Sequence, residues 1–198
     1  MSDDLLSLMA PKRGHFRLES GHHAGFWLDL NGLFTEPQRT RTFIPALARV
    51  IRPHDVAGIC GPLVGGALLA QMLASALDVE FFFTEREALE DGDGLYRVRY
   101  RLPAGVRSRV RGRRLAIVDD AISAGSAVRG TLAELEAHGA EAVVVATLLL
   151  LGSAAGSYFA ERGLPLEAVK RVPFELWVPA ECPLCASGVP LEDPAAVA

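Results

Sequence analysis

The stretch LAIVDDAISAGSAVRG, residues 115–130, is the most informative part of this sequence. Four apolar residues run directly into two neighbouring carboxylates, Asp119 and Asp120, and five small residues follow soon after them. An apolar run bounded by small and polar residues favours a buried strand, and small residues before an apolar-periodic stretch favour a loop that leads into a helix. We therefore predict a strand from Leu115 to Asp119 and a helix that begins at Ser126.

Strand and helix patterns alternate along the rest of the chain. Short apolar runs predict strands at 56–60, 79–84, 115–119 and 141–151, and longer stretches predict helices at 2–9, 37–50, 66–77 and 126–138, the last closed by Gly139. Because several strands are apolar throughout, helices are expected on both faces of the sheet. We predict an α/β fold, with residues 1–198 as a single domain and a mainly parallel sheet flanked by helices.

Bulk properties restrict the class of protein. The chain has 198 residues, half of them hydrophobic, which is enough for one domain with a sizeable core. It has no apolar run of about 18 residues and no basic start typical of a signal peptide, so we expect a cytoplasmic protein without a membrane span. The net charge of −4 argues against general binding of nucleic acid.

The two carboxylates and the small loop have a common chemical interpretation. Ligands of open α/β sheets bind beyond the carboxyl ends of the strands, where Asp119 and Asp120 are expected. Backbone N–H groups at the start of the helix at Ser126 favour an anion such as phosphate. The carboxylates suit ligand hydroxyls or a magnesium ion, so a sugar phosphate satisfies both halves of the motif. The alternative is a polar strand end followed by a tight turn.

This motif resembles the 5-phosphoribosyl-1-diphosphate (PRPP) signature of type I phosphoribosyltransferases. The resemblance implies that Asp119 and Asp120 are catalytic residues that hold the ribose 2- and 3-hydroxyls, with Mg²⁺ bound nearby through PRPP. The residues implied to hold the 5-phosphate are Ser123, Ala124, Gly125, Ser126 and Ala127. The implied reaction is displacement of pyrophosphate at the anomeric carbon by a base nitrogen, without a side-chain nucleophile.

A second stretch, ICGPLVGGALLA at residues 59–70, is consistent with this resemblance. In the family it corresponds to the loop that cradles pyrophosphate, which implies that Gly61, Pro62 and Gly65 contact PRPP. Arg86 is assigned to PRPP as well. Glycines at a strand–helix junction are explained equally well by close packing, so this alternative stays open.

The N-terminal stretch GHFRLESGHHAGFWLDL, residues 14–30, resembles the hood segment of orotate phosphoribosyltransferases, and the tail CPLCASGVPLE at 182–192 resembles a short bacterial branch of them. The resemblance implies a hood over about residues 1–35 plus the C-terminal segment. It also implies a base pocket formed by Phe16, Ser20, His23 and Phe26.

The sequence also departs from the family pattern. In the flexible-loop stretch EREALEDG, residues 85–92, Leu89 and Asp91 stand where many members have lysine and histidine. The stretch LLLLGSAAG, residues 148–156, has no arginine where members usually use one for orotate, and Glu19 replaces a lysine. Two alternatives therefore remain beside an orotate enzyme: a phosphoribosyltransferase for an uncharged base, and a non-catalytic PRPP-binding regulator.

Nine of the 20 basic residues are arginines within 84–114. In LYRVRYRL, residues 95–102, arginine alternates with Tyr, Val or Leu, so the arginines share one strand face. A second alternating row at 107–113 suggests a flexible hairpin over about 85–113 whose arginine face meets pyrophosphate. We assign Arg97 and Arg99 to catalysis and, from the resemblance, expect a homodimer that shares its sites. The alternative is a solvated surface hairpin.

Cys182 and Cys185 form a Cys-x-x-Cys pair. This pair could bind zinc with ligands from another chain, or it could form a redox pair. Because the sequence has no second such pair, a plain structural role is the simplest interpretation.

Overall fold

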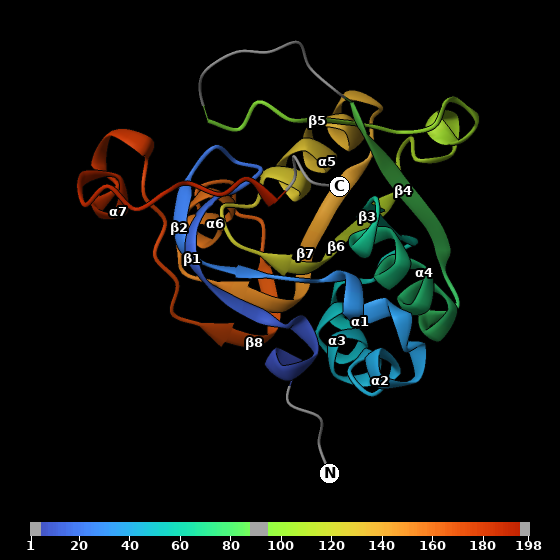
Figure 1. The fold of residues 1–198 in the computed structure, drawn as a ribbon. Coiled ribbons are helices and arrows are strands. Elements are labelled where there is room, and N and C mark those ends of the chain that lie inside the picture. The colour runs from blue at the N-terminus through green and yellow to red at the C-terminus, as the bar shows by residue number, and fades with distance from the viewer. Residues whose placement is uncertain (1–4, 88–94, 195–198) are drawn as a thin grey trace.

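The computed structural model describes residues 5–87 and 95–194. A six-stranded sheet forms the centre, in the order β5-β4-β3-β6-β7-β8, and every neighbouring pair is parallel except β4 and β5 (Figure 1). The strands are β3 (Gly58–Pro62), β4 (Glu80–Glu87), β5 (Arg99–Arg101), β6 (Arg114–Ile122), β7 (Glu141–Leu151) and β8 (Leu166–Val172). The predicted α/β fold with a mainly parallel sheet is confirmed.

Helices cover both faces of the sheet. On one face lie α3 (Ile44–Ile51) and α4 (Gly65–Leu77), and on the other lie α5 (Ser126–Ala137) and α6 (Ala154–Ala160) (Figure 1). Strand β6 shows the reason for its continuous apolar run: Ala116 and Val118 pack with α3 and α4, whereas Leu115 and Ile117 pack with α5. All four side chains are fully buried, as expected of a strand between two helical layers.

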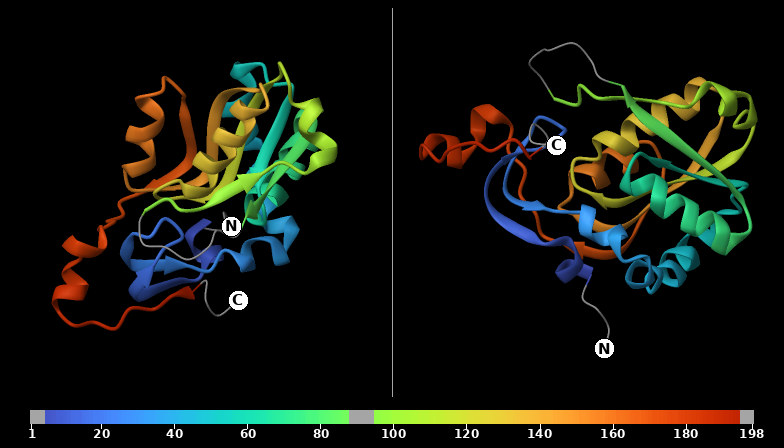
Figure 2. Two further views of the ribbon diagram at one scale, coloured as in Figure 1. Left: turned by 90° about the horizontal axis from the view of Figure 1, so that it is seen from above. Right: turned by 45° about the vertical axis from the view of Figure 1, so that its right-hand side comes forward.

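The N-terminal part forms a separate layer over one end of the sheet. It consists of η1 (Leu5–Met9), the antiparallel strands β1 (Pro11–Arg17) and β2 (His23–Leu28), and the short helices α1 (Asn31–Thr35) and α2 (Pro37–Arg41). The C-terminal segment, with η4 (Pro179–Glu181) and α7 (Pro183–Ala186), runs beside the β1–β2 hairpin (Figure 2). We call these two parts together the hood.

Several predicted boundaries are wrong. The helix expected over 37–50 is two helices, α2 and α3, because Pro45 lies in the first turn of α3 and disfavours helical geometry in the residue before it. Strand β6 continues to Ile122, so Asp119 and Asp120 lie within the strand and not after it. Helix α6 and strand β8 were not predicted, since a seven-residue helix and a strand with charged residues give weak patterns. Residues 2–4 of the expected first helix lie outside the described residues.

The predicted hairpin with two arginine rows is also wrong. The antiparallel partner of β5 is β4, with Glu85 opposite Arg101 and Glu87 opposite Arg99. Residues 104–109 form a 3-10 helix, η3 (Ala104–Arg109), held by the buried side chains of Leu102 and Val110 on either side of it. Charge repulsion between arginine rows therefore does not arise. The alternation itself is confirmed, because the arginines of β5 are exposed whereas Tyr100 is buried.

Acidic side chains neutralise many of these arginines. Arg101 lies 3.2 Å from Glu87 and 3.1 Å from the buried Glu134, and both Arg109 and Arg113 pair with Glu80. Within the described ranges no helix combines the length and the apolar character needed to cross a bilayer.

Candidate functional site

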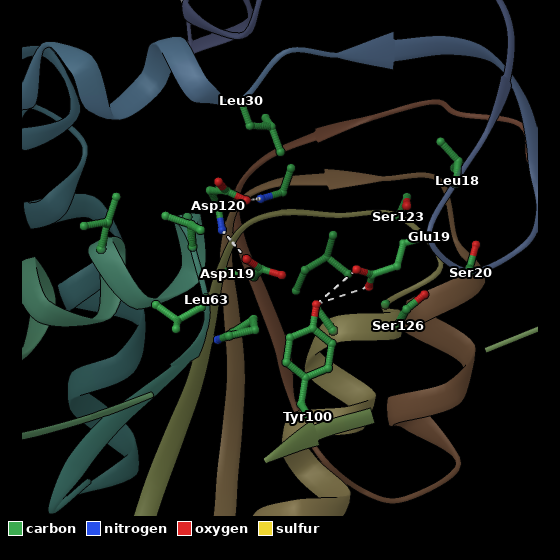
Figure 3. A pocket seen from close by; sticks show the side chains of 18 of the residues that line it. Leu18, Glu19, Ser20, Leu30, Leu63, Tyr100, Asp119, Asp120, Ser123 and Ser126 are labelled. Atoms are coloured by element: carbon green, nitrogen blue, oxygen red, sulfur yellow. Dashed lines mark hydrogen bonds between the residues drawn. The ribbon is translucent and has the colours of Figure 1, made fainter. Parts of the chain in front are cut away.

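A cavity of about 480 Å³ opens at the carboxyl end of the sheet (Figure 3). Its volume lies in the range of small-molecule sites. Its walls come from the β1–β2 turn, the start of α4, the end of β6 and the start of α5. Eight of the residues assigned to PRPP line it: Pro62, Gly65, Asp119, Asp120, Ser123, Gly125, Ser126 and Ala127. Ser20, assigned to the base, lines it as well.

Asp119 and Asp120 form a buried carboxylate pair at the end of β6, with exposed fractions of 9% and 5%. Asp119 Oδ1 accepts a hydrogen bond from the Asp120 backbone N–H at 3.0 Å, and Asp120 Oδ1 accepts one from Ala121 at 2.7 Å. Burial raises the pKa of both carboxyls, to about 6 for Asp120, and the charge of Asp120 further raises the pKa of Asp119. The pair is therefore poorly solvated and prepared for a ligand with hydroxyl donors or positive charge.

Helix α4 begins directly against these carboxylates. A Cβ atom on Gly65 would overlap the Asp120 carboxylate, and one on Gly66 would lie 2.7 Å from Asp119 Oδ1. These glycines allow the N-terminus of a 13-residue helix to approach the pair. Gly61 has a different role, because its hydrogens face the Gly66 carbonyl, where a side chain would collide. Close packing explains Gly61, and it does not line the cavity among the described residues.

The loop before α5 has the geometry of an anion site. Gly125, the residue before the helix, has a φ of +82°, a left-handed conformation that favours glycine. The first turn of the 12-residue helix thus opens into the cavity, with the hydroxyl-bearing Ser123 and Ser126 in the wall (Figure 3). Ala124 lies buried beneath the loop, so it supports the loop through packing.

Two wall residues were not assigned from the sequence, Glu19 and Tyr100. The Tyr100 hydroxyl donates to the Glu19 carboxylate at 3.1 and 3.3 Å, and Arg86 Nε lies 3.5 Å from Glu19 Oε2. Burial raises the pKa of Glu19, an effect partly opposed by Arg86 and Tyr100. The inward position of Tyr100 could have been read from its alternation with arginines, but the contact with a residue 81 positions away could not.

A smaller cavity of about 160 Å³ adjoins the first one. Both share the same five wall residues: Leu18, Glu19, Leu30, Ala121 and Ser123. The remaining wall of the smaller cavity is largely aromatic and apolar, with Phe26, Trp27 and Phe174. Phe26, assigned to the base, therefore faces a compartment with the character of a site for a flat ring.

The other assigned residues lie elsewhere. Phe16 is buried, 6.4 Å from the ring of Trp27, and His23 contacts His15 and Cys185 in the hood. Arg97 and Arg99 lie on the exposed face of the chain at β5. Together with Arg86, none of these side chains is found in the walls of the two cavities formed by residues 5–87 and 95–194.

Burial of the carboxylate pair makes stability depend on pH. Asp120 binds its proton more tightly in the folded chain, where its pKa is about 6, than at its ordinary value of 3.8. Stability from this group is thus present below about pH 4 and is lost as the pH rises to about 6, by roughly 3 kcal/mol. We expect Asp120→Asn to gain stability over the parent between pH 4 and pH 7, measured by urea unfolding without ligand. An unchanged difference across this range contradicts the buried acid.

Known proteins place this geometry in a family. Residues 54–177 match the family model "Phosphoribosyl transferase domain". The orotate phosphoribosyltransferase of Carboxydothermus hydrogenoformans is 30% identical over 197 residues, 96% of this chain and 96% of its own length. That of Nitratiruptor sp. is 32% identical over 187 residues, 89% of this chain and 88% of its own.

Solved structures share the fold. The orotate phosphoribosyltransferase of Aeropyrum pernix superposes with a TM-score of 0.64 at 21% identity, over 82% of this chain and 88% of that one. The adenine phosphoribosyltransferase of Thermoanaerobacter pseudethanolicus gives 0.67 at 16%, over 87% and 100%. At such identities the structures establish the fold only. On the family model and the two sequence relatives, the chain belongs to the phosphoribosyltransferase family, among relatives named orotate phosphoribosyltransferase.

Proposed function

We propose that this chain transfers the 5-phosphoribosyl group of PRPP to orotate and releases pyrophosphate. The observation that carries the proposal is the shared cavity, in which the Asp119–Asp120 pair lies between the N-termini of α4 and α5. The adjoining apolar cavity supplies space for a ring, and the names of the sequence relatives favour orotate as the base.

Each part of PRPP has a matching group. The carboxylates of Asp119 and Asp120 accept hydrogen bonds from the ribose hydroxyls, and the loop at Gly125 holds the 5-phosphate on the N-terminus of α5. Pyrophosphate lies against the start of α4 at Gly65. In the reaction the bond from the anomeric carbon to the pyrophosphate oxygen breaks, and a bond to the base nitrogen forms. The protein positions both partners and screens them from water.

The site suits Mg²⁺ carried by PRPP. Two buried carboxylates whose pKa values are raised form an anionic strand end that a cation stabilises, and oxygen ligands are those that Mg²⁺ prefers. The bound ion neutralises charge that develops on the leaving pyrophosphate. Asp119 and Asp120 are the residues that lie nearest to it in this proposal.

The reaction is tested by incubating the pure protein with PRPP, Mg²⁺ and one base at a time, and measuring pyrophosphate release. Orotate is expected to support release, whereas uracil, adenine and hypoxanthine are not. Release with an uncharged base alone would identify the second candidate, a transferase for that base. Binding of PRPP without release for any base would identify a regulator and overturn the proposed reaction.

We further propose that the chain acts as a cytoplasmic homodimer and that the exposed arginines near β5 serve the neighbouring subunit's cavity. Arg99 lies on the face of β5 opposite to Tyr100, which faces the chain's own cavity. A partner subunit is therefore the site that Arg99 can reach. Cations that contact a leaving group act mainly in the transition state.

Arg99 and Arg101 separate this role from a structural one. Arg99→Gln is expected to lower kcat at an unchanged melting temperature. Arg101→Gln is expected to lower the melting temperature, because it leaves Glu134, only 3% exposed, without its cationic partner. Mixing Arg99→Gln with Asp119→Asn/Asp120→Asn restores some activity if sites are shared. Full turnover by Arg99→Gln returns the arginines to the solvated surface.

A further inference from the structure

Four potential metal ligands meet in the hood, outside both cavities. They are His15 in β1, His23 in β2, Cys182 before α7 and Cys185 within α7. Their ligand atoms all lie within 4.8 Å of one another. Two histidines and two cysteines form one of the common ligand sets of structural zinc. We propose that these four side chains bind one Zn²⁺ ion, which joins the C-terminal segment to the β1–β2 hairpin.

The separations fit a tetrahedral site. His15 Nε2 lies 3.0 Å from His23 Nδ1, 3.4 Å from Cys182 Sγ and 3.7 Å from Cys185 Sγ, and Cys185 Sγ lies 3.3 Å from His23 Nδ1. Zinc bonds of about 2.0–2.1 Å to nitrogen and about 2.3 Å to sulfur give ligand separations of about 3.3–3.8 Å around a tetrahedron. The cluster already has these dimensions to within a few tenths of an ångström.

Hydrogen bonding alone accounts poorly for this arrangement. The Nδ1 atom of His15 lies 2.8 Å from the Val189 carbonyl oxygen, which can only accept, so Nδ1 carries the proton. The neutral ring then has one lone pair, on Nε2. Three atoms approach that single lone pair within 3.7 Å, and it cannot accept from all of them. A metal ion among the four atoms uses one lone pair from each, and the Val189 contact orients the His15 ring for it.

The local backbone is built to aim both histidines inward. A register shift between Arg13 and Phe16 interrupts the β1–β2 ladder, so the consecutive side chains of His15 and Phe16 are both buried. A bulge of this kind re-aims a side chain that would otherwise face solvent. Gly14 permits it, because a Cβ there would lie 2.7 Å from the Phe16 ring. Cys182 is buried as well, whereas Cys185 is exposed and gives the ion a way in.

The C-terminal segment has few other anchors. Cys182 is the one residue between 173 and 194 that is buried in the described part of the chain. Backbone hydrogen bonds join His23 to Trp177 and Glu192 to His15 and Arg17, all at the two strands that carry the histidines. A segment with so little apolar burial gains much from a metal crosslink, as small domains with limited cores do (Figure 2).

The ion would also affect the neighbouring cavities. His15 and His23 stand at the two ends of the turn whose residues Leu18, Glu19 and Ser20 line the cavity wall. Fixing both ends limits the motion of that turn. The ion takes no part in the transfer reaction, and its presence can be measured whichever base the enzyme uses.

The first test measures metal in the intact protein. Protein produced with Zn²⁺ in the medium and purified without chelator is expected to hold about one zinc per chain. Cys182→Ser/Cys185→Ser and His15→Gln are expected to hold almost none. The matched controls, Cys60→Ala and His54→Gln, change the same residue types away from the cluster and should retain the metal. Parent protein without zinc, or full zinc in the double-serine variant, would overturn the site.

A second measurement covers variants that fail to fold. Titration of the metal-free parent with Co²⁺ is expected to give intense visible bands of a tetrahedral ion, with sulfur-to-metal charge-transfer absorption, saturating at one equivalent. Zn²⁺ should displace Co²⁺, and metal removal should lower the melting temperature. Weak octahedral bands contradict the site, and so does a Cys182–Cys185 disulfide in the freshly purified protein, detected by mass spectrometry after alkylation.

Discussion

Replacement of both carboxylates, in Asp119→Asn/Asp120→Asn, is expected to remove most PRPP binding while the fold stays intact. Amides keep the volume of the side chains but remove the charge that strengthens hydrogen bonds from the ribose hydroxyls. Each bond to a charged acceptor contributes about 1.5–3 kcal/mol, so loss of two weakens binding by about 100-fold or more. Calorimetric titration with PRPP and Mg²⁺ measures the loss, and circular dichroism checks the fold.

Asp78→Asn is the matched control for this variant. Asp78 ends α4 in a left-handed conformation that asparagine also tolerates, and it is not a wall residue of either described cavity. Its PRPP affinity should equal that of the parent. Parent-like affinity in the double variant would mean that the carboxylate pair does not bind ribose.

Gly125→Val is expected to have a comparable effect, through the 5-phosphate. At a φ of +82° a β-branched residue is strained, and its Cβ would lie 3.3 Å from Ala155 and 3.4 Å from Val128. The loop must move away from the N-terminus of α5, so several charge-assisted contacts to phosphate are lost together. We expect PRPP affinity to fall by about 100-fold or more, measured by the same titration.

Gly105→Val is the control, since a Cβ on Gly105 meets nothing within 4 Å. It introduces the same side chain on η3, away from the cavity, and should bind PRPP like the parent. Normal turnover by Gly125→Val would identify residues 123–127 as an ordinary turn.

Much of the sheet could be predicted because its signals are local. Strand β7 begins and ends where its apolar run does, and Gly139, in a left-handed conformation, ends α5 as expected. The predicted meeting of Asp119 and Gly65 rested on the rule that strand ends share one edge of a parallel sheet. The structure does place both residues in one cavity wall.

Other features depend on contacts between distant residues. The arginines of 95–113 suggested a self-repelling hairpin because the sequence does not reveal Glu80, Glu87 and Glu134 as their partners. The Cys182–Cys185 pair lacked companions for the same reason, since His15 lies 167 positions from Cys182. Such pairings are decided by the packing of the hood on the C-terminal segment, for which local periodicity carries no information.

The most direct test of the proposed reaction follows orotate itself. With saturating PRPP and Mg²⁺, consumption of orotate and formation of its 5-phosphoribosyl nucleotide are monitored together by chromatography, with the parent and with Asp119→Asn/Asp120→Asn. We predict that the parent forms nucleotide and pyrophosphate in equal amounts and that the double variant forms neither at a comparable rate. Unchanged orotate in the presence of parent protein that binds PRPP would contradict the assignment of orotate phosphoribosyl transfer to this chain.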